Sequence, residues 1–249
     1  MTTHPVSRHT LVGLFSLLVV AGFWLSRLEW SPEHRLWRAV GDASYVLLVL
    51  ALISGPLARL WPATAWALPW RREVGVWCGL LALVHTLVTL DGWIGWDLQR
   101  LFGYEYVAQL GRYARLEPGF GLANAVGFVA LFLTLILAAT SSAWAVNLLG
   151  PSAWKWLQYG SYSVFYLAAL HSFYFLFIHF TQSFHRASPP EANWFQIPFL
   201  LITLLVPALQ TAAFVRTVAR RRRGERTMGK QPSSGRRRAP SGEQMPGVE

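Results

Sequence analysis

The sequence predicts an all-α integral membrane protein: a bundle of six transmembrane helices followed by a disordered, basic C-terminal tail. Three observations lead to this prediction. Hydrophobic residues make up 53% of the 249 residues and charged residues only 14%, whereas a soluble globular chain is about 25% charged. Six stretches stay apolar over roughly the 20 residues that are needed to cross a bilayer. Much of the net charge of +10 lies at one end of the chain.

The six spans follow from the apolar stretches taken in order. The first stretch resembles a signal peptide, but Phe23, Trp24 and Leu25 lead straight into Arg27 without a small-residue cleavage site, so we expect it to be retained. The predicted spans are Thr10–Leu25, Val40–Leu60, Val74–Ile94, Gly121–Thr140, Ser161–Phe180 and Trp194–Val215.

The distribution of Lys and Arg predicts the orientation. If the N-terminus is cytoplasmic, fifteen of these residues fall inside and seven outside, which favours both termini in the cytoplasm because cytoplasmic loops carry the excess of positive charge.

Most of the positive charge lies in the C-terminal tail. From Arg216 to the end, the chain has ten Lys and Arg and three Glu, which accounts for +7 of the net +10. We therefore attribute this positive charge to the tail of a membrane protein and expect no nucleic-acid partner. The Pro, Ser, Gly and Arg-rich composition after Gly229 predicts disorder, and Arg220–Arg223 could contact anionic membrane lipid.

The connection between the third and fourth spans, Gly95 to Gly119, is unusually long. Its apolar residues recur at loosely helical spacings with arginines between them, which suggests an interfacial helix on the outer leaflet. Such a helix could be a landing surface for a partner protein. The simpler alternative is a loop that follows the membrane surface.

Three of the seven histidines, His85, His171 and His179, lie within or at the edge of predicted spans. An ionisable side chain there is costly and is by default a functional candidate. His85 and His171 each lie about ten residues from the inner start of their spans, which is roughly 15 Å at 1.5 Å per residue. They are therefore predicted at similar height near the midplane. His179 is predicted near the outer boundary, where a water-facing histidine needs no explanation.

Two imidazoles at equal depth on separate helices are what axial ligation of a haem iron needs. The residues one turn before them, Leu81 with Ala82 and Leu167 with Ala168, are small or aliphatic and suit a flat macrocycle. Hydrogen bonding between helices and an ion or proton path remain open alternatives, although the scarcity of Asp and Glu within the spans weakens the second. The single cysteine, Cys78, excludes an internal disulfide and CxxC metal sites. No repeat period is evident.

Several short stretches, in fixed order, resemble a known family. They are Leu-Ile-Ser-Gly-Pro-Leu-Ala-Arg-Leu (52–60), Arg-Arg-Glu-Val-Gly (71–75) followed by Leu-Val-His (83–85), Leu-Thr-Leu-Ile-Leu-Ala-Ala-Thr-Ser (133–141), Trp-Lys-Trp-Leu-Gln (154–158) and Tyr-Leu-Ala-Ala-Leu-His (166–171). From about Gly41 to Phe180 the sequence resembles the ferric-reductase-like transmembrane domain. Within that family it is most similar to the MsrQ or YedZ branch, the haem-binding membrane subunits of bacterial periplasmic methionine-sulfoxide reductase systems.

The resemblance implies a b-type haem held by His85 and His171. It also implies transfer of electrons across the cell inner membrane, from a cytoplasmic flavin reductase or a membrane quinol to a periplasmic oxidoreductase, a molybdopterin-dependent methionine-sulfoxide reductase. FMN or quinone could then be further cofactors. The family usually has another histidine where this chain has Gln158, so the resemblance does not fix the number of haems. Arg71 and Arg72 are candidates for docking an acidic donor or a flavin phosphate, although anchoring the helix end explains them equally well.

The resemblance, together with the composition of the tail, divides the chain into an N-terminal helix and outer loop (1–39), a haem-binding ferric-reductase-like transmembrane domain (40–216) and a disordered basic cytoplasmic tail (217–249). The sequence shows no strand–GxGxxG–helix unit for a nicotinamide cofactor. We therefore expect a subunit that relays electrons rather than a complete enzyme. The alternatives are a cofactor-free membrane scaffold or assembly subunit and, less favoured, an ion or proton transporter.

Overall fold

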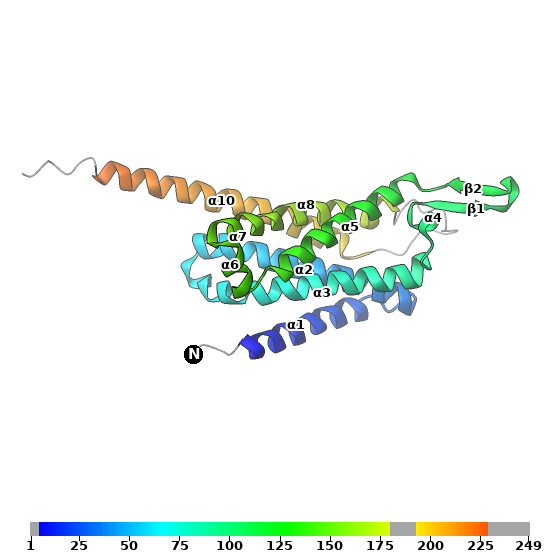
Figure 1. Cartoon of the computed structure of the whole chain (residues 1–249), viewed down its shortest axis with the longest axis horizontal. Helices are drawn as coiled ribbons and strands as arrows, with labels where there is room; N and C mark the ends of the chain where they lie inside the picture. Colours follow the sequence, from blue (N-terminus) through cyan, green and yellow to red (C-terminus); the bar gives the residue numbers. More distant parts are fainter. Residues whose placement is uncertain (1–4, 180–192, 229–249) are drawn as a thin grey trace, which may run out of the picture.

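The computed structural model describes residues 5–179 and 193–228, which form a bundle of long helices with one small β-hairpin at its end (Figure 1). Six helical stretches of these residues are long and apolar enough to cross a membrane, as the sequence predicted. They are Val6–Leu25, Pro32–Leu60, Pro62–Ile94, Gly119–Ala139, Pro151–Ile178 and Gln196–Arg223. The chain is therefore a multi-pass membrane protein.

The regular elements alternate between long spans and short connecting helices. The α-helices are α1 (Pro5–Leu25), α2 (Pro32–Leu60), α3 (Arg71–Thr89), α4 (Leu98–Leu101), α5 (Pro118–Ala139), α6 (Ala143–Leu149), α7 (Pro151–Gln158), α8 (Gly160–Phe173) and α10 (Gln196–Met228). Two 3-10 helices, η1 (Pro62–Trp70) and η3 (Ala108–Leu110), lie in connections. Two π-helical segments, η2 (Leu90–Ile94) and η4 (Tyr174–Ile178), extend α3 and α8.

Helix α2 starts earlier than its predicted span. The Ser31 hydroxyl accepts a hydrogen bond from the His34 backbone N–H, Pro32 occupies the first turn and Glu33 follows it. Each of these residues favours a helix start. The helix ends at Leu60, because the following Trp61 precedes Pro62 and adopts an extended backbone.

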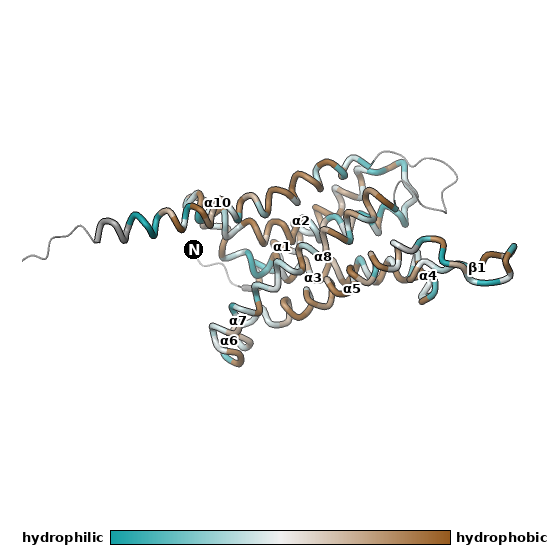
Figure 2. Tube along the Cα trace, turned by 90° about the horizontal axis from the view of Figure 1, so that it is seen from above, coloured by the Kyte–Doolittle hydropathy of each residue, from teal (hydrophilic) through white to brown (hydrophobic). Residues whose placement is uncertain are grey.

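Helix α2 is the central element of the bundle and packs against α1, α3, α8 and α10. Half of its most apolar stretch is buried, against 17–22% for the other five spans. The outward faces of those spans carry exposed side chains such as Leu18, Phe132 and Leu201, and the hydropathy trace is apolar along most of the helices (Figure 2). Large apolar faces of this kind suit contact with lipid tails.

The long connection after the third span is a β-hairpin, so the predicted interfacial helix is wrong. Strands β1 (Tyr104–Val107) and β2 (Arg112–Arg115) pair antiparallel, and only the single turn of α4 precedes them. Gly103 and Gly111 both have positive φ, of 80° and 59°. This backbone conformation interrupts a helix at both points and favours a turn.

Helix α10 continues beyond the predicted end of the last span. It runs to Met228, so the first part of the segment predicted as a disordered tail, from residue 217, is helical. The predicted disorder after Gly229 lies outside the described residues.

The first predicted span corresponds to α1, which packs against α2 and α3.

A buried ion pair joins α2 to the connection before it. The Nη2 atom of Arg27 lies 2.6 Å from Oδ2 of Asp42, and the two side chains are 2% and 10% exposed. The same nitrogen donates to the side-chain oxygen of Asn193, just before α10. The guanidinium group of Arg27 also lies 5.2 Å from the ring centroid of Trp30. The pair therefore holds α2 against the segments that precede α2 and α10.

We predict that Arg27→Met destabilises the protein by about 3–5 kcal/mol, because it leaves the Asp42 carboxylate buried without its charge partner. Thermal unfolding of the detergent-solubilised protein, followed by circular dichroism, measures the effect. The double variant Arg27→Met/Asp42→Asn removes both charges and should recover most of the lost stability. Equal destabilisation by the single and double variants would show that the charge pairing is unimportant.

Candidate functional site

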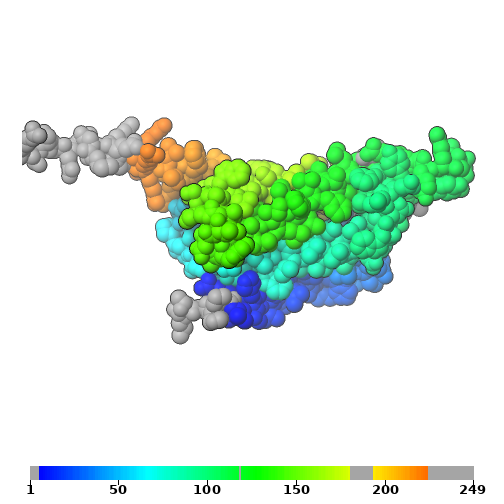
Figure 3. Space-filling model, in the orientation of Figure 1, coloured from blue at the N-terminus to red at the C-terminus, as the bar shows by residue number. Residues whose placement is uncertain are grey.

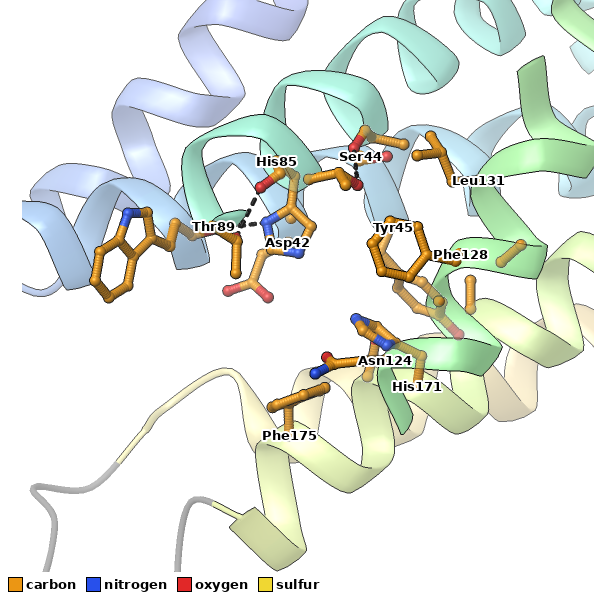
Figure 4. Close-up of a pocket in the computed structure, with 18 of the residues that line it drawn as sticks. Asp42, Ser44, Tyr45, His85, Thr89, Asn124, Phe128, Leu131, His171 and Phe175 are labelled. Atoms are coloured by element: carbon orange, nitrogen blue, oxygen red, sulfur yellow. Dashed lines mark hydrogen bonds between the residues drawn. The ribbon is translucent and has the colours of Figure 1, made fainter. Parts of the chain in front are cut away.

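A cavity lies inside the bundle between α2, α3, α5 and α8 (Figure 4). About 1300 Å³ inside it is free of protein atoms, including the space at its open mouth. Most of its lining is aliphatic or aromatic, with few ionisable side chains. The apolar part includes Leu48, Ala82, Phe128, Leu131, Val164 and Ala168. Such a cavity suits a large, flat, apolar ligand that a few polar groups hold in place.

His85 on α3 and His171 on α8 enter this cavity from opposite sides (Figure 4). The centroids of their imidazole rings are 6.5 Å apart, and the ring planes are inclined by 80°. The structure thus brings together the two histidines that helix geometry placed at equal depth.

Each imidazole is fixed by a backbone carbonyl of a neighbouring helix. Nδ1 of His85 lies 2.9 Å from the carbonyl oxygen of Trp37 on α2, and Nδ1 of His171 lies 2.8 Å from that of Ala123 on α5. A carbonyl oxygen only accepts hydrogen bonds, so Nδ1 carries the proton in both rings. The Nε2 lone pair of each neutral ring is then left for a ligand in the cavity. Carbonyl acceptors orient metal-binding histidines in the same way.

A glycine under each ring permits these hydrogen bonds. A Cβ atom at Gly127 would lie 2.6 Å from Nδ1 of His171, and one at Gly41 would lie 2.9 Å from Cε1 of His85. Each glycine stands four residues after the accepting carbonyl, which is one helical turn further on. The sequence-based reasoning identified neither glycine as a functional residue.

The two half-sites form an internal repeat, so the expectation of no repeat is wrong. Each histidine follows its carbonyl acceptor by 48 residues and its glycine by 44. Ala-Val-Gly occurs at 39–41 and at 125–127, and Leu-Ala-x-x-His followed by Thr or Ser occurs at 81–86 and at 167–172. The pairs α2–α3 and α5–α8 also make the most extensive contacts between described helices. This spacing is the sequence signal that could have revealed both glycines.

Arg38 is the one Lys or Arg that lines the cavity within the described part of the chain. Its Nη2 donates to the carbonyl oxygen of Phe175 at 2.7 Å. Phe175 belongs to the π-helical segment η4, and π-helical turns recur at functional sites. The carboxylate of Asp42 and the amide of Asn124 also line this part of the cavity.

The donor set fits a metal that brings most of its own ligands. Among residues 5–179 and 193–228 no cluster of three or more His, Cys, Asp or Glu could hold a metal ion, and a bare ion usually needs about four such ligands. Iron in a porphyrin needs only axial ligands from the protein. Two in-line bonds of about 2 Å, plus about 1 Å from each Nε2 to its ring centroid, would separate the centroids by roughly 6 Å. The separation of 6.5 Å between His85 and His171 is close to this value.

The other candidate residues lie away from the cavity. His179 is buried rather than water-facing, with 3% of its surface exposed, and its Nδ1 lies 2.9 Å from Oε2 of Glu117. Gln158, at the end of α7, has its amide 3.5 Å from the Leu137 carbonyl oxygen. Arg71 and Arg72 are exposed at the start of α3, at the opposite end of the bundle from the hairpin (Figure 1).

The fold and the cavity together define a class: multi-pass helical membrane proteins with a pair of opposed histidines inside the bundle. A family model described as "Ferric reductase like transmembrane component" matches residues 40–169. The chain belongs to this family.

Three curated relatives share one name, that of a haem-binding subunit. The haem-binding subunit MsrQ of protein-methionine-sulfoxide reductase from Bordetella pertussis is 32% identical to this chain, over 69% of this chain and 81% of the relative. The subunit from Bordetella parapertussis has the same identity and coverage. That from Azospira oryzae is 30% identical, over 60% of this chain and 58% of the relative.

Proposed function

We propose that this chain is a haem b-binding electron-transfer subunit of the cell inner membrane. The opposed imidazoles of His85 and His171 carry the proposal, because both rings leave Nε2 for a ligand at a separation that suits one iron atom. The relatives named as haem-binding subunits of a methionine-sulfoxide reductase support it.

The residues of this chain have separable roles toward the haem. His85 and His171 would be its axial ligands, and Trp37 and Ala123 fix the two rings through their carbonyl oxygens. Arg38 would place a positive charge beside the carboxylates of the macrocycle, since an anion buried in an apolar cavity needs a cationic partner. When bound, the haem supplies one-electron exchange between ferric and ferrous iron.

The proposed path runs along the bundle from one side of the membrane to the other. Both termini would be cytoplasmic, and the hairpin end would then be periplasmic. A cytoplasmic flavin reductase carrying FMN, or a membrane quinol, would be the donor. A periplasmic oxidoreductase, the molybdopterin-dependent catalytic subunit of a methionine-sulfoxide reductase, would be the acceptor. Arg71 and Arg72, exposed at the opposite end from the hairpin, would be available to an acidic or phosphate-bearing donor.

We predict that His85→Ala or His171→Ala removes most of the bound haem, because each variant deletes one axial ligand. Absorbance of the purified protein measures this through the Soret band and the reduced b-type peaks. His9→Ala serves as the control, and His179→Ala should retain most of the haem because its ring pairs with Glu117 outside the cavity. A wild-type protein that stays colourless after reconstitution with haem would instead favour the cofactor-free scaffold.

Gly127→Ala should lower the haem content severalfold or alter the haem spectrum, because the new Cβ would lie 2.6 Å from Nδ1 of His171 and must displace the ring. Gly75→Ala is the matched control, since no heavy atom lies within 4 Å of the position of its Cβ. Absorbance and haem quantification of the two variants, purified side by side, provide the comparison. Full haem content and an unchanged spectrum in Gly127→Ala would contradict this positioning role.

A further inference from the structure

The β1–β2 hairpin is the most prominent surface feature that the bis-histidine cavity does not explain. It projects beyond the ends of the spans along the long axis of the bundle (Figures 1 and 3). Because the spans run along the same axis, a hairpin in this direction stands away from a bilayer rather than lying on its surface. This geometry favours contact with a protein over contact with lipid.

The exposed side chains of the two strands are tyrosines and arginines, and the turn between the strands exposes Ala108, Gln109 and Leu110. Tyr106 and Tyr113 pair across the strands with ring centroids 5.6 Å apart and are 59% and 49% exposed. The guanidinium group of Arg115 lies 5.8 Å from the Tyr104 ring centroid, and Arg112 is also exposed. Tyrosine and arginine dominate the energetic centres of protein interfaces, because they combine large contact areas with directional hydrogen bonding.

The charge of the hairpin is positive. On the two strands, Arg112 and Arg115 of β2 outnumber Glu105 of β1, whose carboxylate lies 3.9 Å from Arg100 on α4. The charge of Arg100 is itself offset by Asp97 at the start of α4. Two positive charges against one negative charge leave the strands a surplus of one. A partner that covers the hairpin should therefore present an acidic surface.

The base of the hairpin is built into the wall of the cavity. Leu101 and Asn124 both line the cavity, and the side-chain amide of Asn124 donates to the Leu101 carbonyl oxygen at 2.8 Å. Asn124 directly follows Ala123, the residue whose carbonyl holds His171. Trp93 and Phe120 separate the cavity from a small hollow at the hairpin base, since they line both. A protein docked on the hairpin would thus lie over the wall of the histidine site.

Three contacts hold the hairpin base in place. The backbone N–H of Leu116 donates to the Gly103 carbonyl oxygen at 3.0 Å. Gly121 lies directly against the backbone of Phe102, where a Cβ would come within 2.7 Å. The buried pair of His179 and Glu117 joins the end of the fifth span to the start of α5. These contacts let the hairpin act as a fixed platform.

We infer that the hairpin is the docking platform for the electron-acceptor protein and that it binds an acidic face of that protein through Arg112, Arg115 and the exposed tyrosines. This inference rests on the proposed function, because it takes the catalytic subunit of a methionine-sulfoxide reductase as the occupant. It goes beyond that function by naming the surface and the charge of the partner face.

The test uses the full haem-loaded chain in nanodiscs of neutral lipid and the purified catalytic subunit of methionine-sulfoxide reductase as the probe. Binding is measured by biolayer interferometry, and oxidation of the pre-reduced haem is followed by stopped-flow absorbance. In Arg112→Glu/Arg115→Glu, both the association rate and the oxidation rate should fall by about tenfold or more at low salt. The wild-type association rate should itself fall as salt screens the charges. Tyr106→Ser should mainly speed dissociation.

Leu28→Glu is the control, because it adds a negative charge at the same end of the bundle on a side chain that is 66% exposed and outside the hairpin. It should leave both rates unchanged, and every variant should keep its haem. Hairpin-dependent binding without haem oxidation would support the platform and contradict the proposed electron transfer. Equal binding by wild type and hairpin variants, or no binding by wild type, would overturn the platform. A loss confined to association with anionic-lipid nanodiscs would overturn it too and would identify the hairpin as a lipid contact.

Discussion

The site depends on a hydrogen bond that is made twice, from an imidazole Nδ1–H to a helix carbonyl oxygen. In a helix, such a carbonyl oxygen already faces the backbone N–H of the residue one turn further on. An imidazole can reach the second lone pair of the oxygen only where that later residue has no Cβ in the way. Gly41 and Gly127 provide this access. The bond satisfies a polar group that would be costly to bury alone, and it turns Nε2 of each histidine into the cavity. The close approach of α3 to α2 and of α8 to α5 follows from the same contact.

The internal repeat produces this contact once in each half of the bundle. One half of the bundle supplies Gly41 and His85, and the other supplies Gly127 and His171 with the same spacing. Each half contributes one nitrogen, so neither half can complete an axial pair alone, and a ligand between the rings would join the two halves. Polar contacts elsewhere reinforce this arrangement. Arg38 joins α2 to η4 beside the cavity, and the pair of Arg27 and Asp42 holds α2 against its neighbours. The outward apolar faces are left for lipid.

The sequence was sufficient for features that depend on fixed geometry. The rise per residue of a helix placed His85 and His171 at one depth, and apolar length located the six spans. Features that depend on packing between segments were missed. The role of Gly41 depends on the imidazole of His85, which packs against it. The burial of His179 depends on Glu117, which is distant in the sequence. The interfacial helix suggested for the long connection was wrong, because apolar spacing alone does not reveal the positive φ of Gly103 and Gly111. The early start of α2 was readable from Ser31, Pro32 and Glu33, which form a helix N-terminus signal.

Ligation of one iron by both imidazoles is tested most directly by electron paramagnetic resonance of the oxidised, haem-loaded protein. Two axial histidines make ferric haem low-spin. Ring planes inclined by 80° should give the strongly anisotropic low-spin signal of near-perpendicular imidazoles. That signal should convert to high-spin when either His85 or His171 is replaced by alanine and haem is added back. A wild-type protein whose bound haem is high-spin, or whose low-spin signal survives both replacements, would contradict the paired-histidine site.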